Sequence, residues 1–333
     1  MSRTDLYPLR FEPLYQYRPW GGRRLSKLLS SPLPEAGPVG EAWLLSDRED
    51  HPSVVAEGPL KGRTISELLR QFPQLLVVPS APVNRFPLLL KFLDVQGRLS
   101  VQVHPSDEHR QLIPEGESAK TEAWVVLEKG PDARIFAGLK QGTTAIGLIG
   151  AIASGTVPEQ LASFTPSIGD AVRVPAGTVH SLGDVVVFEV QQNSDVTFRL
   201  YDWDHVDPKT GQKRPLQQQQ AMACVDFSQG VVKPGTPKVE DTSPVLRENL
   251  IDCEQFGVTR ITGAVSFVVG DAQLARVLVC LSGAGRLERY GVSYFIGKGD
   301  VYLLPAAFGA CACVPHGVVS LLEVSLPRSL RPG

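Results

Sequence analysis

The sequence predicts a mainly β protein made of two barrels, with a small helical insertion in the first. Short apolar runs alternate with a period of two, which is typical of strands that bury one face. The 31 Gly and 27 Pro residues suit tight turns better than long helices. A sequence pattern recurs once in each half of the chain, so the same strand–turn–strand unit is expected to be built twice.

Length and composition narrow the class of protein. With 333 residues, 43% of them hydrophobic and 20% charged, the chain is long enough for two soluble globular domains. The formal net charge is −2 with both signs interspersed, which argues against nucleic acid and anionic membranes as partners. The first six residues carry no apolar signal segment, and no run approaches the ~18 apolar residues of a membrane span. We therefore expect a cytoplasmic protein.

The cysteines do not form a recognisable framework. There are five, none in a CxxC pattern, and they lie in the C-terminal half at positions Cys224, Cys253, Cys280, Cys311 and Cys313. An odd number without a framework fits reduced thiols in a cytosolic protein. We do not favour them as zinc ligands.

The expected elements follow in order along the chain. Residues 6–60 contain short strands, including 42–45 and 53–56. Thr64 begins a helix through residue 72, with Glu67 completing a capping box. Strands are expected at 87–93, 99–103, 122–127, 171–174, 185–191 and 196–201, with a helical insertion over about 140–165. Residues 1–224 would form the first barrel, 225–247 a linker rich in Pro, Lys and Asp, and 248–333 a second barrel.

The internal repeat joins residues 169–180 to residues 299–310. Both segments begin with Gly-Asp, continue for four residues and reach Pro-Ala. His180 ends the first copy, whereas Ala310 stands at the matching position of the second. The second barrel is therefore expected to lack this potential ligand and to be structural.

The strand over 99–103 predicts a polar site. Leu99, Val101 and Val103 alternate with Ser100 and Gln102, and His104 continues the polar face. Glu122 and His180 offer a carboxylate and a second imidazole from two other segments. Two His, one Glu and one Gln form a plausible N/O metal site. Taken singly, each has an ordinary alternative: a hydrogen-bonded core histidine, a solvated strand carboxylate, or a capped strand end.

Several ordered motifs resemble a known family. The pattern from Gly169 to His180 resembles the second signature motif of the cupin superfamily of jelly-roll barrels. Five segments together are similar to the type I mannose-6-phosphate isomerase family in its short bacterial form. They are residues 87–94, 99–105, 120–124, 175–180 and 191–202, and residues 20–22 and 40–43 also match. The resemblance covers residues 10 to about 215, with a looser match in the second barrel, and implies two cupin-type jelly rolls.

The resemblance also implies a site. One Zn²⁺ per chain would be held by Gln102, His104, Glu122 and His180. Arg199 matches an arginine of the family's active site, where a guanidinium can stabilise enediolate charge. Lys120 shares a strand face with Glu122 and is a candidate for proton transfer, unless it is a solvated rim lysine. Ser100 and Lys91 are candidate substrate-binding residues, and Lys91 needs a buried partner or an opening to solvent. The other histidines, His51, His109, His205 and His316, are interpreted as non-ligands.

The implied activity is reversible isomerisation of mannose 6-phosphate and fructose 6-phosphate through a cis-enediol, with the metal as a Lewis acid. The substrate would be a small phosphosugar. Two alternatives stay open: the same barrel acting on another phosphosugar or on free mannose, and a non-catalytic sugar-binding cupin. The first alternative is motivated by His205 and Gln217, which stand where the family usually has basic residues. Lys209, Lys213 and Arg214 are possible substitutes. The metal actually loaded and the oligomeric state do not follow from the sequence.

Overall fold

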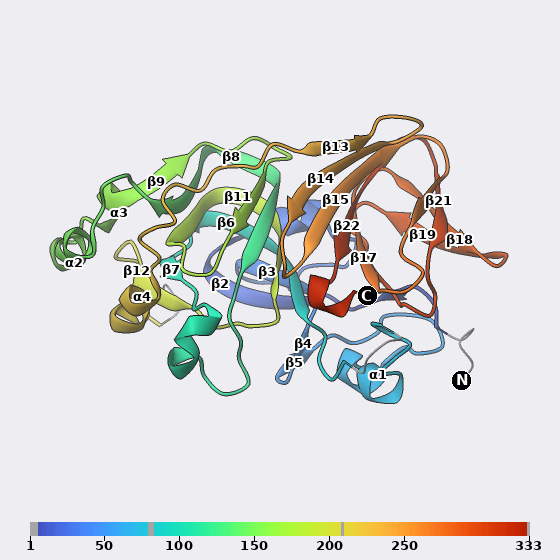
Figure 1. Cartoon of the computed structure of the whole chain (residues 1–333), viewed down its shortest axis with the longest axis horizontal. Helices are drawn as coiled ribbons and strands as arrows, with labels where there is room; N and C mark the ends of the chain where they lie inside the picture. Colours follow the sequence, from blue (N-terminus) through green and yellow to red (C-terminus); the bar gives the residue numbers. More distant parts are fainter. Residues whose placement is uncertain (1–5, 79–82, 208–209, 332–333) are drawn as a thin grey trace.

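The two halves of the chain lie next to each other along the long axis of the molecule (Figure 1). In this computed structural model, the structure describes residues 6–78, 83–207 and 210–331. The strands from β2 (Leu14–Gly22) to β12 (Phe198–Tyr201) lie mostly toward one end, from which helices α2 (Ala145–Ser154) and α3 (Val157–Gln160) project. The strands from β13 (Lys238–Asp241) to β22 (Val319–Ser325), in orange and red, lie toward the other end. The predicted mainly β architecture with a small helical insertion is confirmed.

The N-terminal half is organised around a nine-stranded sheet whose central strands are β8, β11 and β6. The pairings between these strands are antiparallel. The strands of the sheet are β2 (Leu14–Gly22), β3 (Val39–Leu45), β6 (Leu88–Arg98), β7 (Val101–Val103), β8 (Glu122–Leu139), β9 (Leu161–Phe164), β10 (Ala171–Val174), β11 (His180–Gln192) and β12 (Phe198–Tyr201). A separate short hairpin pairs β4 (Asp47–Arg48) with β5 (His51–Pro52). Of the strand expected at 53–56, only isolated bridges at Val54 and Val55 form.

The C-terminal half contains two sheets that enclose an apolar interior. The seven-stranded sheet consists of β1 (Leu9–Arg10), β13 (Lys238–Asp241), β14 (Leu246–Asp252), β15 (Gly257–Gly263), β17 (Arg276–Ser282), β20 (Val301–Leu304) and β22 (Val319–Ser325). The four-stranded sheet consists of β16 (Phe267–Val269), β18 (Ala284–Arg289), β19 (Val292–Gly297) and β21 (Cys311–Pro315). Leu278, Cys280, Leu287, Cys313 and Leu321 are among the side chains that fill the space between them.

The helices predicted from the sequence are confirmed in part. Helix α1 (Ile65–Gln71) begins after Thr64, and the predicted capping box with Glu67 is present. The insertion contains α2 (Ala145–Ser154) and α3 (Val157–Gln160), but residues 161–164 form β9 instead of continuing the helix. This strand pairs with β8, so sheet hydrogen bonds override the local helical signal. The remaining helical elements are α4 (Gln218–Cys224), η2 (Arg24–Lys27), η3 (Asp107–Leu112) and η4 (Arg328–Leu330).

Two features bear on the predicted division into domains. Strand β1 pairs with β20, so residues near the N-terminus complete the sheet of the C-terminal half. Within the expected linker, β13 pairs with β14. One buried apolar cluster also contains side chains from both halves, including Phe188 and Leu322. The boundaries at 224 and 248 stay a prediction.

The internal repeat is confirmed as a repeated structure. Strands β10 and β20 occupy the same places in the two copies, and Gly169 and Gly299 precede them with φ of 89° and 86°. In each copy, the aspartate after the glycine accepts a hydrogen bond at 2.8 Å from a backbone N–H three residues earlier, Ser167 for Asp170 and Gly297 for Asp300.

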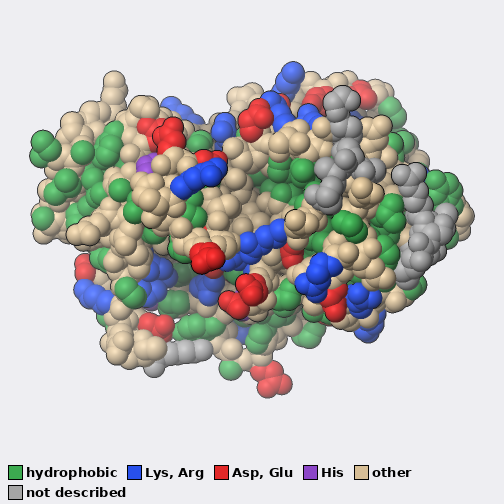
Figure 2. Space-filling view, turned by 60° about the horizontal axis from the view of Figure 1, so that its bottom comes forward, with side chains coloured by type: hydrophobic (Ala, Val, Ile, Leu, Met, Phe, Trp, Pro, Cys, Tyr) green, Lys and Arg blue, Asp and Glu red, His purple; other side chains and the backbone are tan. Residues whose placement is uncertain are grey.

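On the face shown in Figure 2, acidic and basic side chains are interspersed and do not form a large patch of one charge. This distribution agrees with the net charge of −2. Among the described residues, no helix is both long and apolar enough to cross a bilayer.

The two repeat glycines give a matched test of backbone strain. An alanine at either position would adopt a left-handed φ, which costs roughly 1–2 kcal/mol. At Gly299 its Cβ would also collide with the carbonyl oxygen of Leu28, whereas at Gly169 it would lie 3.0 Å from the flexible end of Arg260. We expect Gly299→Ala to lower the free energy of unfolding in urea by clearly more than Gly169→Ala. Equal losses would contradict this assignment of strain.

Candidate metal centre and active-site cavity

Cross-strand register brings together the polar side chains predicted from the strand at 99–103. Gln102 on β7 pairs with His180, the first residue of β11, and on its other side with Arg199 on β12. His104 lies just beyond the end of β7, and its carbonyl oxygen accepts a hydrogen bond from the N–H of Gly177 at 2.9 Å. This bond ties the segment that carries His104 to the turn that precedes His180.

A second row of side chains crosses four strands of the same sheet. Trp43 pairs with Lys91, Lys91 with Glu189, and Glu189 with Trp124, on β3, β6, β11 and β8. Glu122, the first residue of β8, pairs with Gln191. Because side chains alternate between faces with a period of two, Glu122 and Trp124 share one face of β8, as Glu189 and Gln191 do on β11.

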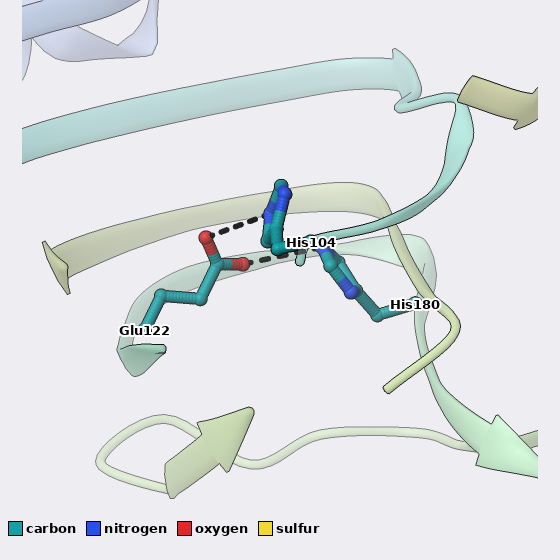
Figure 3. Close-up of side chains that lie close together, drawn as sticks. All are labelled: His104, Glu122 and His180. Carbon is teal, nitrogen blue, oxygen red and sulfur yellow. Dashed lines mark ion pairs between the residues drawn. The ribbon is translucent and has the colours of Figure 1, made fainter. Parts of the chain in front are cut away.

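His104, Glu122 and His180 converge on one point from three separate segments (Figure 3). The Nε2 atom of His104 lies 3.2 Å from Oε2 of Glu122, and Nε2 of His180 lies 3.3 Å from Oε1. One ligand atom from each residue lies within 4.8 Å of the others, and all three side chains are buried. These three residues are positioned to bind a metal ion. The other four histidines do not belong to this group.

The protonation state of the group favours a cation between the side chains. Burial lowers the pKa of His180, and burial together with the charge of Lys120 lowers the pKa of His104 to about 3. Burial alone would raise the pKa of Glu122, but neighbouring charge, first that of Lys120, outweighs burial and lowers this pKa well below its usual value. The residues are therefore two neutral imidazoles and a carboxylate at neutral pH.

The nitrogen and oxygen atoms of this group that face one another have no hydrogen-bond partner. The carbonyl oxygen of Thr178 lies 2.8 Å from Nδ1 of His180, which fixes the proton on Nδ1 and leaves a lone pair on Nε2. The Nε2 atoms of both histidines and both oxygens of Glu122 are buried without a hydrogen-bond partner. The Nε2 atoms of both histidines face the Glu122 carboxylate, and a divalent cation between them would satisfy atoms that the protein leaves without hydrogen bonds. The donor set therefore fits a metal ion.

A cavity of about 360 Å³ lies next to this group. The predicted residues Lys91, Ser100, Gln102, Lys120 and Arg199 all line it, whereas His104, Glu122 and His180 do not. Lys120 links the two regions, because its Nζ lies 3.2 Å from Oε2 of Glu122. The structure thus brings every predicted site residue to one region. Their separate roles stay predictions.

Sequence reasoning did not assign a role to the acidic residues around Lys91. The Nζ atom of Lys91 lies 3.6 Å from carboxylate oxygens of Glu41, Glu189 and Asp195. Burial opposes a charged Lys91, but these carboxylates outweigh it and raise its pKa. Burial, and then the charge of Glu122, raise the pKa of Glu189 to about 7. The expected need of Lys91 for a buried partner is met.

Tryptophan indoles orient two of these carboxylates. Trp43 donates to Glu41 at 2.6 Å, and Trp124 donates to Glu189 at 2.9 Å. Arg18 donates to the second oxygen of Glu41 at 2.7 Å. An acid within an apolar strand, as Glu189 is, was the available sequence signal for this network.

Comparison with known proteins places the chain in a family. The model of the type I phosphomannose isomerase catalytic domain matches residues 9–122. The mannose-6-phosphate isomerase ManA of Bacillus subtilis is 34% identical over 303 residues, covering 91% of this chain and 94% of that protein. The chain belongs to the type I phosphomannose isomerase family. Another member, the probable mannose-6-phosphate isomerase GmuF of the same organism, is also 34% identical, covering 91% of this chain and 95% of that protein.

Solved structures of the phosphomannose isomerase family have the same fold. The mannose 6-phosphate isomerase from Bacillus subtilis superposes with a TM-score of 0.88 and 29% identity, covering 96% of this chain and all of that one. A phosphomannose isomerase from Salmonella typhimurium has a TM-score of 0.73 at 14% identity over 97% of this chain and all of that one, which supports the fold alone. The predicted cupin-type fold class is confirmed.

The metal content of two variants tests whether His104, Glu122 and His180 bind one ion. Removing the His180 imidazole should weaken metal binding by more than the roughly 10–100-fold typical of losing a residue that only orients a ligand. We expect His180→Ala to retain little metal by elemental analysis after dialysis. His316→Ala, which removes an exposed histidine of the C-terminal half, is the control. Equal metal in the two variants would contradict the site.

The Glu41 carboxylate predicts a pH dependence of stability. Burial would raise its pKa, but Lys91 and Arg18 outweigh burial and hold it at about 2, below the usual 4.5. Its contribution to the free energy of unfolding is therefore complete above pH 4.5 and is lost as the pH falls toward 2. At pH 6, Glu41→Gln should cost roughly 1–3 kcal/mol, because Arg18 loses its carboxylate partner while Lys91 keeps Glu189 and Asp195.

The difference in the free energy of unfolding between the native protein and Glu41→Gln should shrink below pH 4.5, by up to about 1.4 kcal/mol per pH unit. Urea unfolding at pH 6, 4 and 3 measures it. Glu35→Gln, which alters an exposed carboxylate, is the control. A difference that stays constant with pH would exclude Glu41 as its source.

Proposed function

We propose that this protein is a metal-dependent mannose-6-phosphate isomerase that interconverts mannose 6-phosphate and fructose 6-phosphate. The observation that carries the proposal is the buried group of His104, Glu122 and His180 beside a polar cavity, in a chain that matches named isomerases along nine-tenths of its length. The cavity suits a small polar substrate, and its lining includes both cations and carboxylates.

We propose Zn²⁺ as the metal and Gln102 as a fourth ligand. Two imidazole nitrogens and a carboxylate oxygen form a set that zinc accepts, and Gln102 is the cross-strand neighbour of His180. When bound, the metal would supply Lewis-acid polarisation of the sugar's carbonyl and hydroxyl oxygens. The same N/O set accepts Fe, Co or Mn, so elemental analysis of the purified protein is needed to identify the ion.

Lys120 is the proposed proton-transfer residue. Isomerisation removes the proton on C2, passes through a cis-enediol and returns a proton to C1, while O2 loses its hydroxyl proton and O1 gains one. Lys120 lines the cavity, and its Nζ lies next to Glu122, so it reaches both the substrate space and the metal group. Lys91 is less suited to proton transfer, because three carboxylates stabilise its charged form. Its fixed charge would instead hold Glu41, Glu189 and Asp195 in place.

Arg199 and Ser100 are proposed to contact the substrate. Both line the cavity on the side of β7 and β12. The guanidinium of Arg199 would stabilise the oxyanion of the enediolate or hold a substrate oxygen. The Ser100 hydroxyl can donate to a substrate oxygen and accept from a substrate hydroxyl.

Isomerase assays with metal analysis test this assignment. Loss of a positioned acid–base group typically costs roughly 10²–10⁴-fold in rate, so we expect Lys120→Ala to lower kcat by this amount while retaining metal. Lys129→Ala, which changes an exposed lysine of the same strand, should retain normal kcat. Chelation of the native protein should abolish activity, and added Zn²⁺ should restore it. Normal kcat in Lys120→Ala would exclude its proposed role, and activity that survives complete metal removal would exclude metal dependence.

A further inference from the structure

Most cations that line the cavity already have a carboxylate partner. They are Arg18, Lys91, Lys120, Arg199 and Arg214. Among the described residues, Arg18 pairs with Glu41, Lys91 with three carboxylates, Lys120 with Glu122 and Arg214 with Asp202, but Arg199 forms no ion pair. The end of the cavity near Arg199 therefore carries the cation whose charge is least balanced by the protein.

Arg214 lies at the same end of the cavity and is held rigidly. Its Nε donates to Oδ2 of Asp202 at 2.8 Å, and its Nη2 forms an ion pair with Oδ1. This two-pronged contact uses one edge of the guanidinium and leaves Nη1 outside it. Asp202 is buried and directly follows β12, the strand of Arg199. The orientation of Arg214 is therefore coupled to the strand that carries Arg199.

Arg199 and Arg214 are also close to each other. Nη1 of Arg199 donates at 2.8 Å to the carbonyl oxygen of Pro215, the residue after Arg214. Burial, followed by the charge of Arg214, lowers the pKa of Arg199, and its Nε is buried without a hydrogen-bond partner. Asp202 offsets one of the two charges, and Asp207, beside Tyr17, contributes another carboxylate to the lining. A dianion between the guanidiniums would gain donors from both.

We propose that Arg214, oriented by Asp202, binds the phosphate group of the sugar phosphate together with Arg199 and thereby sets the preference for phosphorylated over free sugars. The inference rests on the proposed function and deepens it. Phosphate binding by Arg199 and Arg214 also explains how the chain can have His205 and Gln217 at positions where the family usually has basic residues. Of the other cations that the sequence offered, Lys213 pairs with Asp204 at the surface and does not line the cavity. Lys209 lies outside the described residues.

The test compares two neighbouring charge removals, Arg214→Gln and Lys213→Gln, in the metal-loaded protein. A hydrogen bond to a charged group typically corresponds to a roughly 10- to 150-fold change in an equilibrium constant. We expect Arg214→Gln to lower the ratio of kcat/KM for mannose 6-phosphate to that for mannose by this factor, mainly through KM. The inhibition constant of inorganic phosphate should rise in parallel. Lys213→Gln should change neither quantity by more than about twofold.

Asp202→Asn separates positioning of Arg214 from a general loss of structure. It should weaken phosphate binding in the same direction as Arg214→Gln but less, with metal content unchanged. If Arg214→Gln matches Lys213→Gln in KM and in phosphate inhibition, the inference is wrong. Calorimetric titration of inorganic phosphate gives a readout independent of turnover. If the native protein binds phosphate through Arg214 but does not isomerise mannose 6-phosphate, the proposed function is wrong, whereas the role of Arg214 in phosphate binding is supported.

Discussion

The rest of the site depends on one unfavourable juxtaposition, a buried carboxylate that faces two neutral imidazoles whose Nε2 atoms have no hydrogen-bond partner. In water these groups would turn toward solvent, but Glu122, His104 and His180 are fixed at the start or end of paired strands. Their backbones are hydrogen-bonded to neighbouring segments, so the three side chains cannot leave the site by a small movement. Folding thus preorganises a cation site, and the sheet supplies the free energy that holds its ligands together.

Around that centre the protein keeps many charges buried by pairing them. Lys91 lies among three carboxylates, two of which also accept hydrogen bonds from tryptophan indoles. Such a network contributes little net stability compared with apolar packing, but it fixes the position and charge state of each member. The walls of the cavity are therefore rigid and polar at once, which suits a substrate rich in hydroxyl groups.

Sequence reasoning found the residues whose signal is local. Ser100, Gln102 and His104 stand out because they share one face of a strand, where an amide and an imidazole two residues apart could both reach one ion. The repeat also predicted the turn at Gly299 from the turn at Gly169. Glu41 and Glu189 were missed as partners of Lys91, because their proximity depends on the register between β3, β6 and β11, which no local pattern encodes. The helix expected through residue 164 was wrong because β8 offered a strand partner to residues 161–164.

The short strand β1 has a consequence for how the chain reaches its native state. Leu9 and Arg10 pair with Leu303 and Tyr302, so one edge of the C-terminal sheet is covered by a segment from the N-terminal half. That contact joins residues far apart along the chain, so a long loop must close before it forms. Until it forms, the backbone amides and carbonyls of β20 along that edge are open to pairing with other chains. A fragment containing only the C-terminal half would keep this edge uncovered, so the N-terminal segment also protects the second barrel from aggregation.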